Sequence, residues 1–182
     1  RILEMSNETK ELSIQKIAIR KFADDRGGLT KIYEELANSE TSPLRSIREA
    51  YISHSKKHVI RGLHYQRGSA SQEKIIYCVT GEFLDVSVDL TSGPSFGKVH
   101  VEHLSANDDF VLRIPGAFAH GIISLSDDTT YLNLSPDNYV PSAESGIHWS
   151  SLGLDIGIRD PIVSDKDANW PSLEEVLKAL SV

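Results

Sequence analysis

Short apolar runs separated by turn residues dominate the chain from its start to about residue 140. The clearest run is residues 83–90, in which every second residue is apolar, and it follows a turn at residues 80–82. Ser92-Gly93-Pro94 and Pro115-Gly116 break the pattern again. Many short strands at this spacing are typical of an all-β sandwich or barrel.

The pattern predicts strands and one helix within a single domain of residues 1–182. The expected strands span residues 12–19, 29–33, 59–66, 74–79, 83–90, 98–104, 110–114, 120–125 and 129–134. We expect a poorly ordered start at residues 1–11, a barrel from 12 to 140, and a C-terminal region from 141 to 182. A helix is predicted at about residues 172–180, because Ser172 can cap it and Val176 and Leu180 share a face.

The strand at residues 59–66 carries the most distinctive side chains. Strict alternation predicts Arg61, Leu63 and Tyr65 on one face, and His64 on the other. Lys74 opens the next strand. A wall with cationic and basic side chains suits an anionic substrate with an acidic C–H bond. A basic strand at the edge of a sheet is the alternative interpretation.

Charge and composition narrow the class of partner. Nineteen Lys and Arg against 26 Asp and Glu give a net charge of −7, without a basic block, which argues against nucleic acid. No apolar run is long enough for a membrane helix. No signal peptide is recognisable, so we expect a cytoplasmic protein. The single Cys78 lies in an apolar strand and is expected to be a buried structural thiol.

Several motifs occur together and in a fixed order along the chain. They are Asp25-Arg26-Gly27, Arg61-Gly62-Leu63-His64-Tyr65-Gln66, Lys74, Ile114-Pro115-Gly116 with Phe118-Ala119-His120-Gly121, Tyr139 with Pro141 and Glu144, and Ser164 with Lys166-Asp167. This set closely resembles the dTDP-4-dehydrorhamnose 3,5-epimerase family over roughly residues 12–173. That family comprises metal-free cupins that epimerise nucleotide-linked 4-keto-6-deoxyhexoses. The resemblance implies a cupin-type jelly-roll β-barrel, no cofactor, a nucleotide-diphosphate sugar substrate and a homodimer.

The reaction implied by the resemblance needs a base, a group that stabilises an enolate, and an acid on the far side of the sugar. Histidine titrates near neutral pH and suits the base. By resemblance His64 is the base, Asp167 orients it, and Lys74 lies near the C4 oxygen. Asp167 could instead serve only as a helix cap.

Further residues match family positions that hold the nucleotide-sugar. They are Arg26, Arg61, His120, Tyr139, Glu144 and Lys166. The alternative for His120 is a structural histidine whose ring is satisfied after a Pro-Gly turn. The alternative for Arg26 and Lys166 is a solvated charge in a turn.

Six positions depart from the family pattern, among them Gly28 and Leu29, which replace a usual aromatic pair beside the nucleotide site. Asn133 stands where the family has its tyrosine acid, and an amide cannot deliver a proton as a phenol does. Lys31 replaces a usual Glu, whereas Glu49 and Tyr51 replace Gln and Asn at positions that help to bind the nucleotide, partly across the dimer. The sequence therefore leaves two questions undecided: which nucleotide base is bound, and whether C3, C5 or both are epimerised.

Two functions of different classes remain. The favoured one is an active epimerase, or a related ketoisomerase that also begins by removing a proton beside a carbonyl. The alternative is a sugar-nucleotide-binding protein that has lost catalysis, which Asn133 motivates and His64 with Asp167 opposes. The pairs His54/His58 and His100/His103 have the wrong spacing for one strand face, so we expect no metal site.

Overall fold

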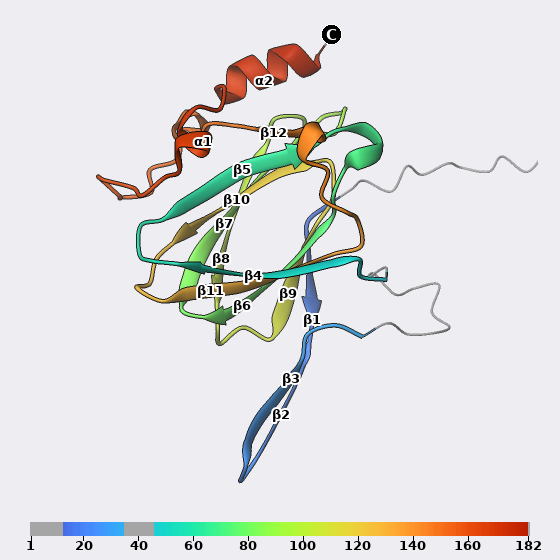
Figure 1. Ribbon diagram of the computed structural model, residues 1–182, viewed down its shortest axis with the longest axis vertical. Coiled ribbons are helices and arrows are strands. Elements are labelled where there is room, and N and C mark those ends of the chain that lie inside the picture. The colour runs from blue at the N-terminus through green and yellow to red at the C-terminus, as the bar shows by residue number, and fades with distance from the viewer. Residues whose placement is uncertain (1–12, 35–45, 182) are drawn as a thin grey trace, which may run out of the picture.

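Two five-stranded antiparallel sheets form a barrel in the computed structural model, which describes residues 13–34 and 46–181 (Figure 1). The first sheet has the order β1 (Gln15–Ala18), β9 (Phe110–Ile114), β6 (Lys74–Thr80), β11 (Thr129–Ser135) and β4 (Glu49–Ser55). The second has the order β12 (Glu144–Gly146), β5 (Ile60–Gln66), β10 (Phe118–Ser124), β7 (Glu82–Asp89) and β8 (Val99–Ser105). The all-β prediction is confirmed.

Helical segments are short and lie mainly after the barrel strands. The α-helices are α1 (Asp165–Ala168) and α2 (Leu173–Leu180), and the 3-10 turns are η1 (Gly68–Ala70), η2 (Pro141–Ala143) and η3 (Trp149–Leu152). Ser172 caps α2 in a reciprocal capping box with Glu175, as the Ser–Glu spacing favours. The predicted C-terminal helix is therefore present. Among the described residues, no helix combines the length and apolar character needed to cross a membrane.

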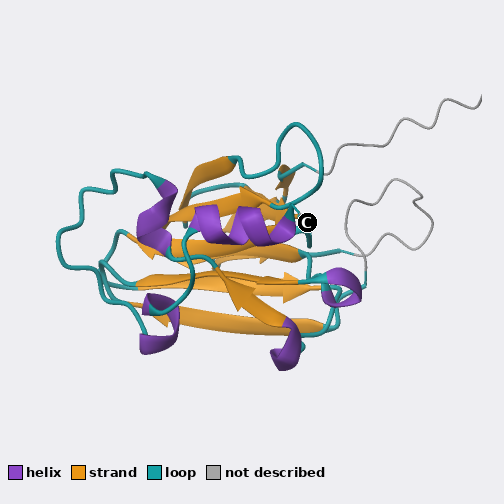
Figure 2. Ribbon diagram, turned by 90° about the horizontal axis from the view of Figure 1, so that it is seen from above, coloured by secondary structure: helices purple, strands orange, loops and turns teal. Residues whose placement is uncertain are grey.

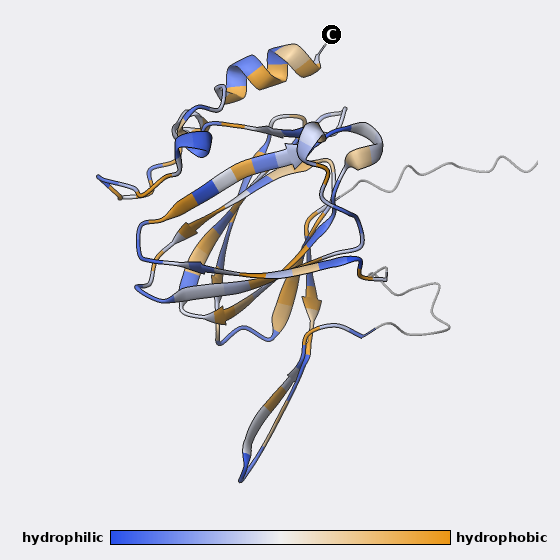
Figure 3. Ribbon diagram, viewed as in Figure 1, coloured by the Kyte–Doolittle hydropathy of each residue, from blue (hydrophilic) through white to orange (hydrophobic). Residues whose placement is uncertain are grey.

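The core has layers inside and outside the barrel. Phe83, Leu112, Phe118, Ile122 and Tyr131 pack between the two sheets. A separate cluster covers the outer face of the second sheet, where Val176 of α2 packs. Seen from above, α2 lies over the strands and runs in roughly their direction (Figure 2). Hydrophobic and hydrophilic positions alternate along several strands (Figure 3), as expected where one face of a strand is buried more than the other.

The register of β5 departs from strict alternation. His64 pairs with His120 and Arg61 pairs with Ile122, with a shift in register between them. Because His120 and Ile122 share a face of β10, Arg61 and His64 share a face of β5. The prediction that these two side chains point to opposite faces was therefore wrong. The irregularity turns a cation and a base to the same side of β5, with Arg61 exposed and His64 partly buried.

The sequence missed β4, β12, α1 and the strand at Arg20–Asp24. β4 is a polar edge strand with an exposed Ile52, so its pattern does not alternate. α1 and β12 are too short to leave a periodic signal. The expected poorly ordered start at residues 1–11 lies outside the described residues, as does most of the polar stretch before β4.

A separate hairpin, β2 (Arg20–Asp24) with β3 (Gly27–Lys31), projects from the barrel beyond β1 (Figure 1). Every residue in both strands is exposed, including Phe22 at 53% and Leu29 at 56%. An isolated two-stranded hairpin has marginal stability in water.

Candidate active site

A pocket of about 250 Å³ opens between the two sheets. Its walls come from β4, β5, β6 and the segment that follows β11. The lining residues are Glu49, Tyr51, His64, Tyr65, Gln66, Gln72, Lys74, Tyr139 and Glu144. Five of the predicted site residues therefore share one pocket with His64, and others stand directly behind it.

His64 and Asp167 form a close pair at this wall. His64 Nε2 lies 2.6 Å from Asp167 Oδ1, and the Gly62 amide donates to Asp167 Oδ2 at 3.0 Å. Burial alone would raise the pKa of Asp167, but hydrogen bonds from His64, Gly62 and Trp170 outweigh it and lower the pKa to about 2. An ionised Asp167 only accepts, so Nε2 carries the hydrogen and Nδ1 is left as the basic atom.

Ser164 positions this carboxylate by starting α1. Its side chain accepts from the Asp167 amide at 3.2 Å. The cap therefore belongs to Ser164, and the buried Asp167 side chain is turned toward β5. The alternative in which Asp167 is only a helix cap is wrong.

Glu144 occupies the other side of the imidazole. Its Oε1 lies 3.8 Å from His64 Nδ1, Tyr139 donates to its Oε2 at 2.8 Å, and Lys166 forms an ion pair with it. Burial opposes ionisation of Glu144, but the bonds from Lys166 and Tyr139 prevail and lower its pKa. Three predicted binding residues thus form one connected group at the rim of the pocket.

Lys74 is a buried cation on the first sheet. Its only hydrogen bond to the described residues is a long one of 3.4 Å to the Gln72 carbonyl. Burial lowers the pKa of Lys74 to about 8, against the opposing charges of Asp85, Glu144 and Glu49. The ammonium therefore faces the pocket with its donors largely unused.

His120 lies deeper in the barrel. Its Nε2 is 2.7 Å from Asp85 Oδ2, and both side chains are buried. The ring is thus satisfied, as the structural interpretation expects. Asp85 also acts electrostatically on Lys74, which connects this pair to the pocket.

Arg61 joins the two sheets at the seam between β5 and β4. Its Nε donates to Ser55 Oγ at 2.9 Å and its NH2 group donates to the His54 carbonyl at 2.8 Å. Glu49, at the start of β4, accepts from Gln72 Nε2 at 2.5 Å. Both predicted binding residues are therefore fixed to neighbouring strands.

Asn133 and Tyr51 are direct cross-strand partners on β11 and β4. Asn133 is completely buried, and neither polar atom of its side chain bonds to any described residue. Tyr131 comes one pair along on the same face, with its ring centroid 6.4 Å from that of Tyr51. Two of the positions that depart from the family pattern thus face each other.

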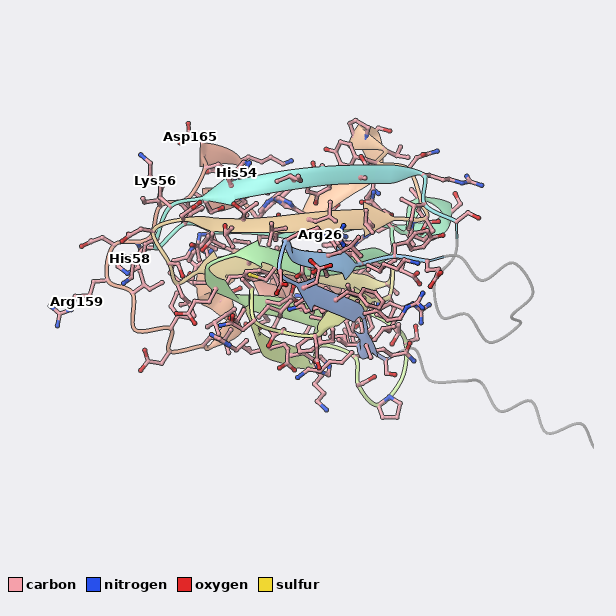
Figure 4. All side chains as sticks on the ribbon, turned by 90° about the horizontal axis from the view of Figure 1, so that it is seen from below. Arg26, His54, Lys56, His58, Arg159 and Asp165 are labelled. Atoms are coloured by element: carbon pink, nitrogen blue, oxygen red, sulfur yellow. The ribbon has the colours of Figure 1, made fainter. Side chains whose placement is uncertain are left out.

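Arg26 and Lys31 stand apart from these residues. Arg26 forms an ion pair with Asp24 at the exposed tip of the hairpin, and Lys31 pairs with Glu34. Figure 4 marks Arg26 on the hairpin, whereas His54, Lys56, His58 and Asp165 gather toward one end of the barrel. One chain does not bring Arg26 and Lys31 to its own pocket.

Sequence reasoning missed two contributors. Trp170 donates from Nε1 to Asp167 Oδ1 at 3.2 Å, and Asp85 binds His120. Asp85 shares its alternating strand with Ser87 and Asp89, so nothing local singled it out, and nothing local marked Trp170. The described residues include no group of three or more His, Cys, Asp or Glu side chains arranged to hold a metal ion.

Comparison with known proteins agrees with this geometry. The family model described as dTDP-4-dehydrorhamnose 3,5-epimerase matches residues 10–175. The enzyme of that name from Shigella flexneri is 38% identical over 153 residues, covering 81% of this chain and 84% of its own.

Solved structures show the same likeness. The Bacillus anthracis dTDP-4-dehydrorhamnose 3,5-epimerase, crystallised with TDP and PPi, is 31% identical with a TM-score of 0.82, covering 91% of this chain and 97% of its own. A 4-keto-6-deoxy sugar epimerase from the novobiocin gene cluster of Streptomyces spheroides is 30% identical, with a TM-score of 0.82 and coverage of 91% and 85%. The chain therefore belongs to the dTDP-4-dehydrorhamnose 3,5-epimerase family, a family of isomerases.

Proposed function

We propose that this protein epimerises a nucleotide-linked 4-keto-6-deoxyhexose, with His64 as the base. The observation that carries the proposal is the 2.6 Å contact between His64 Nε2 and Asp167 at the wall of the pocket. The carboxylate fixes the tautomer and stabilises the imidazolium that forms on proton transfer. A binding protein has no need of an oriented base.

Lys74 supplies the second requirement of the reaction. Removing a proton beside the C4 ketone moves an electron pair to the ketone oxygen and forms an enolate. A cation held in a dry pocket stabilises that negative charge more than it stabilises the neutral ketone. Lys74 is buried, faces the pocket and has donors to spare.

The rim residues are suited to the nucleotide-diphosphate part of the substrate. Arg61 and Lys166 contribute positive charge beside the pocket of a chain whose net charge is −7. Guanidinium and ammonium groups are the usual partners of phosphate oxygens. We assign Tyr139, Glu144, Glu49 and Tyr51 to contacts with the sugar or the base, and His120 to the deeper wall.

We further infer a homodimer in which the hairpin reaches the partner's pocket. Phe22 and Leu29 expose apolar side chains on a hairpin that makes little contact with its own barrel. A second copy of the chain would cover them, and the same contact would carry Arg26 and Lys31 to the partner's nucleotide site. A cytoplasmic location remains a prediction.

Proton NMR in deuterated water tests the function. A panel of nucleotide-linked 4-keto-6-deoxyhexoses is incubated with the wild-type chain and with His64→Ala. We expect deuterium at C3, C5 or both with the wild-type chain and none with His64→Ala. Exchange that survives His64→Ala would refute the assignment of the base.

Binding without exchange would favour the second candidate, a sugar-nucleotide-binding protein. Asn133, at the position of the family acid, is the observation that keeps this candidate in view. A product with its ketone moved from C4 to C3, rather than a 4-keto epimer, would identify a ketoisomerase.

A further inference from the structure

The pocket needs a proton donor on the side opposite His64, and Asn133 cannot provide one. His64 belongs to β5 of the second sheet, so the opposite wall consists of β4, β6 and β11. An amide at position 133 offers N–H donors that do not ionise at neutral pH. The donor must therefore be another residue of the first sheet.

Three phenols line the pocket among the described residues, and only one belongs to the first sheet. Tyr139 donates to Glu144 beside His64, on the same side as the base. Tyr65 adjoins His64 on β5 and is part of the apolar cluster on that sheet. Tyr51 of β4 is the remaining phenol, and it stands directly opposite Asn133.

We infer that Tyr51 is the catalytic acid that protonates the enolate, an inference that rests on the proposed function. The Tyr51 hydroxyl would transfer its proton to the enolate carbon and so form the new C–H bond on the face opposite His64.

The atoms and electrons of this step balance within the pocket. His64 Nδ1 takes the proton as the C–H bond breaks, and the electron pair moves to the ketone oxygen beside Lys74. The pair then returns to carbon as the Tyr51 O–H bond breaks and a C–H bond forms on the other face. Solvent reprotonates the phenolate of Tyr51, which is 42% exposed, and takes the proton from His64.

The surroundings of Tyr51 fit this role. Its hydroxyl hydrogen-bonds to that of Tyr131, which in turn hydrogen-bonds to Ser53. Although Tyr51 as a whole is 42% exposed, burial around its hydroxyl raises the pKa of the phenol, while the nearby Arg61 charge acts in the opposite direction. Arg61 would stabilise the transient phenolate. Tyr131 is a positioning residue in this arrangement.

The completely buried Asn133 amide makes the same wall polar. It has no hydrogen-bond partner among the described residues, although buried amides are almost always bonded. Asn133 is not among the residues that line the pocket, so its amide lies behind Tyr51 on the first sheet. The wall that carries Tyr51 therefore includes a polar group whose bonding capacity is unused.

Tyr51→Phe separates deprotonation from reprotonation. With a dTDP-linked 4-keto-6-deoxyhexose in deuterated water, we expect epimerised product to form about 100-fold more slowly, a loss typical of a general acid. Deuterium should still enter the same carbon with retained configuration, because His64 remains. Tyr77→Phe, on the outer face of β6, is the matched control and should behave as the wild-type chain does.

Each outcome decides the inference. Wild-type rates of epimerisation in Tyr51→Phe would overturn it, and so would the joint loss of exchange and product in a folded variant, since an acid acts after deprotonation. Failure of the wild-type chain to exchange would remove the proposed function and the inference with it. These two results can be told apart. Only failure of the proposed function leaves the wild-type chain, like His64→Ala, without deuterium exchange.

Discussion

Trp170 donates from Nε1 to Asp167 Oδ1, the carboxylate oxygen that also faces His64. The indole lies edge-on to the imidazole, with ring centroids 6.1 Å apart. It also packs over Gly146 of β12, where any side chain would collide with the ring. One tryptophan therefore positions the carboxylate and borders the base.

Trp170→Phe should weaken the base without removing it. The variant loses one hydrogen bond to a charged group, a contribution of about 1.5–3 kcal/mol. We expect deuterium exchange to slow about tenfold and the pKa of Asp167 to rise. Gly146→Ala should act in the same direction by displacing the indole. A Trp170→Phe variant with wild-type exchange would show that His64 and Gly62 suffice to hold Asp167.

Asp167→Asn should slow exchange by about 100-fold or more, because an amide does not stabilise the imidazolium and can favour the wrong tautomer. Asp165→Asn is the matched control, since Asp165 lies on the same short helix but is exposed. Equal effects of the two substitutions would point to damage to α1 instead of a role in orienting the base.

The same carboxylate should contribute to acid stability. The pKa of Asp167 is lowered from 3.8 to about 2, so the unfolded chain binds more protons across that window. Its contribution, about 2 kcal/mol, is fully present above about pH 4 and disappears as the pH falls through 2. Urea unfolding at pH 4.5 and 2.5 should show a smaller loss in Asp167→Asn than in the wild-type chain.

Lys74→Met should abolish exchange and stabilise the fold. Burial lowers the pKa of Lys74 from 10.5 to about 8, so the charged form destabilises the folded chain at pH 7. We expect the variant to gain about 1–3 kcal/mol in the free energy of unfolding at pH 7. The gain should shrink between pH 8 and 10.5, where the wild-type chain becomes more stable. Equal stabilities at pH 7 would mean that the charge is solvated.

If the hairpin reaches the partner's pocket, two variants that are inactive alone should restore activity when their chains are mixed. Arg26→Ala and His64→Ala should each reduce activity as homodimers. In a mixed dimer, one pocket combines an intact His64 with the partner chain's Arg26, so mixing should restore part of the activity. The double variant mixed with wild-type chain provides the matched control. Native mass spectrometry would monitor the exchange of subunits. If the subunits exchange and no activity is recovered, Arg26 lies outside the partner's site.

Phe22→Glu combined with Leu29→Glu should shift the chain from dimer to monomer in sedimentation velocity. The substitution puts charge where apolar side chains are expected to meet a second copy. Ile162→Glu, at a similarly exposed apolar residue outside the hairpin, should leave the dimer intact. A wild-type chain that sediments as a monomer would refute the dimer itself.

Local sequence was sufficient for most of the barrel strands and for the final helix, although not for β4 and β12. Alternation at residues 83–90 and the Ser172–Glu175 cap act between near neighbours, so their signals are visible without the fold. The ordered motifs indicated the family, and the resemblance implied the pairing of His64 with Asp167. That pairing spans 103 positions and has no periodic signature of its own.

Only the tertiary structure decided how the walls of the pocket face each other. The register shift in β5 turned Arg61 and His64 to one face, and pairing of β4 with β11 set Tyr51 against Asn133. The sequence determined which chemical groups are present and where most of the strands form. Contacts between distant strands depend on register and sheet order, which arise from packing the whole barrel and which no local pattern encodes.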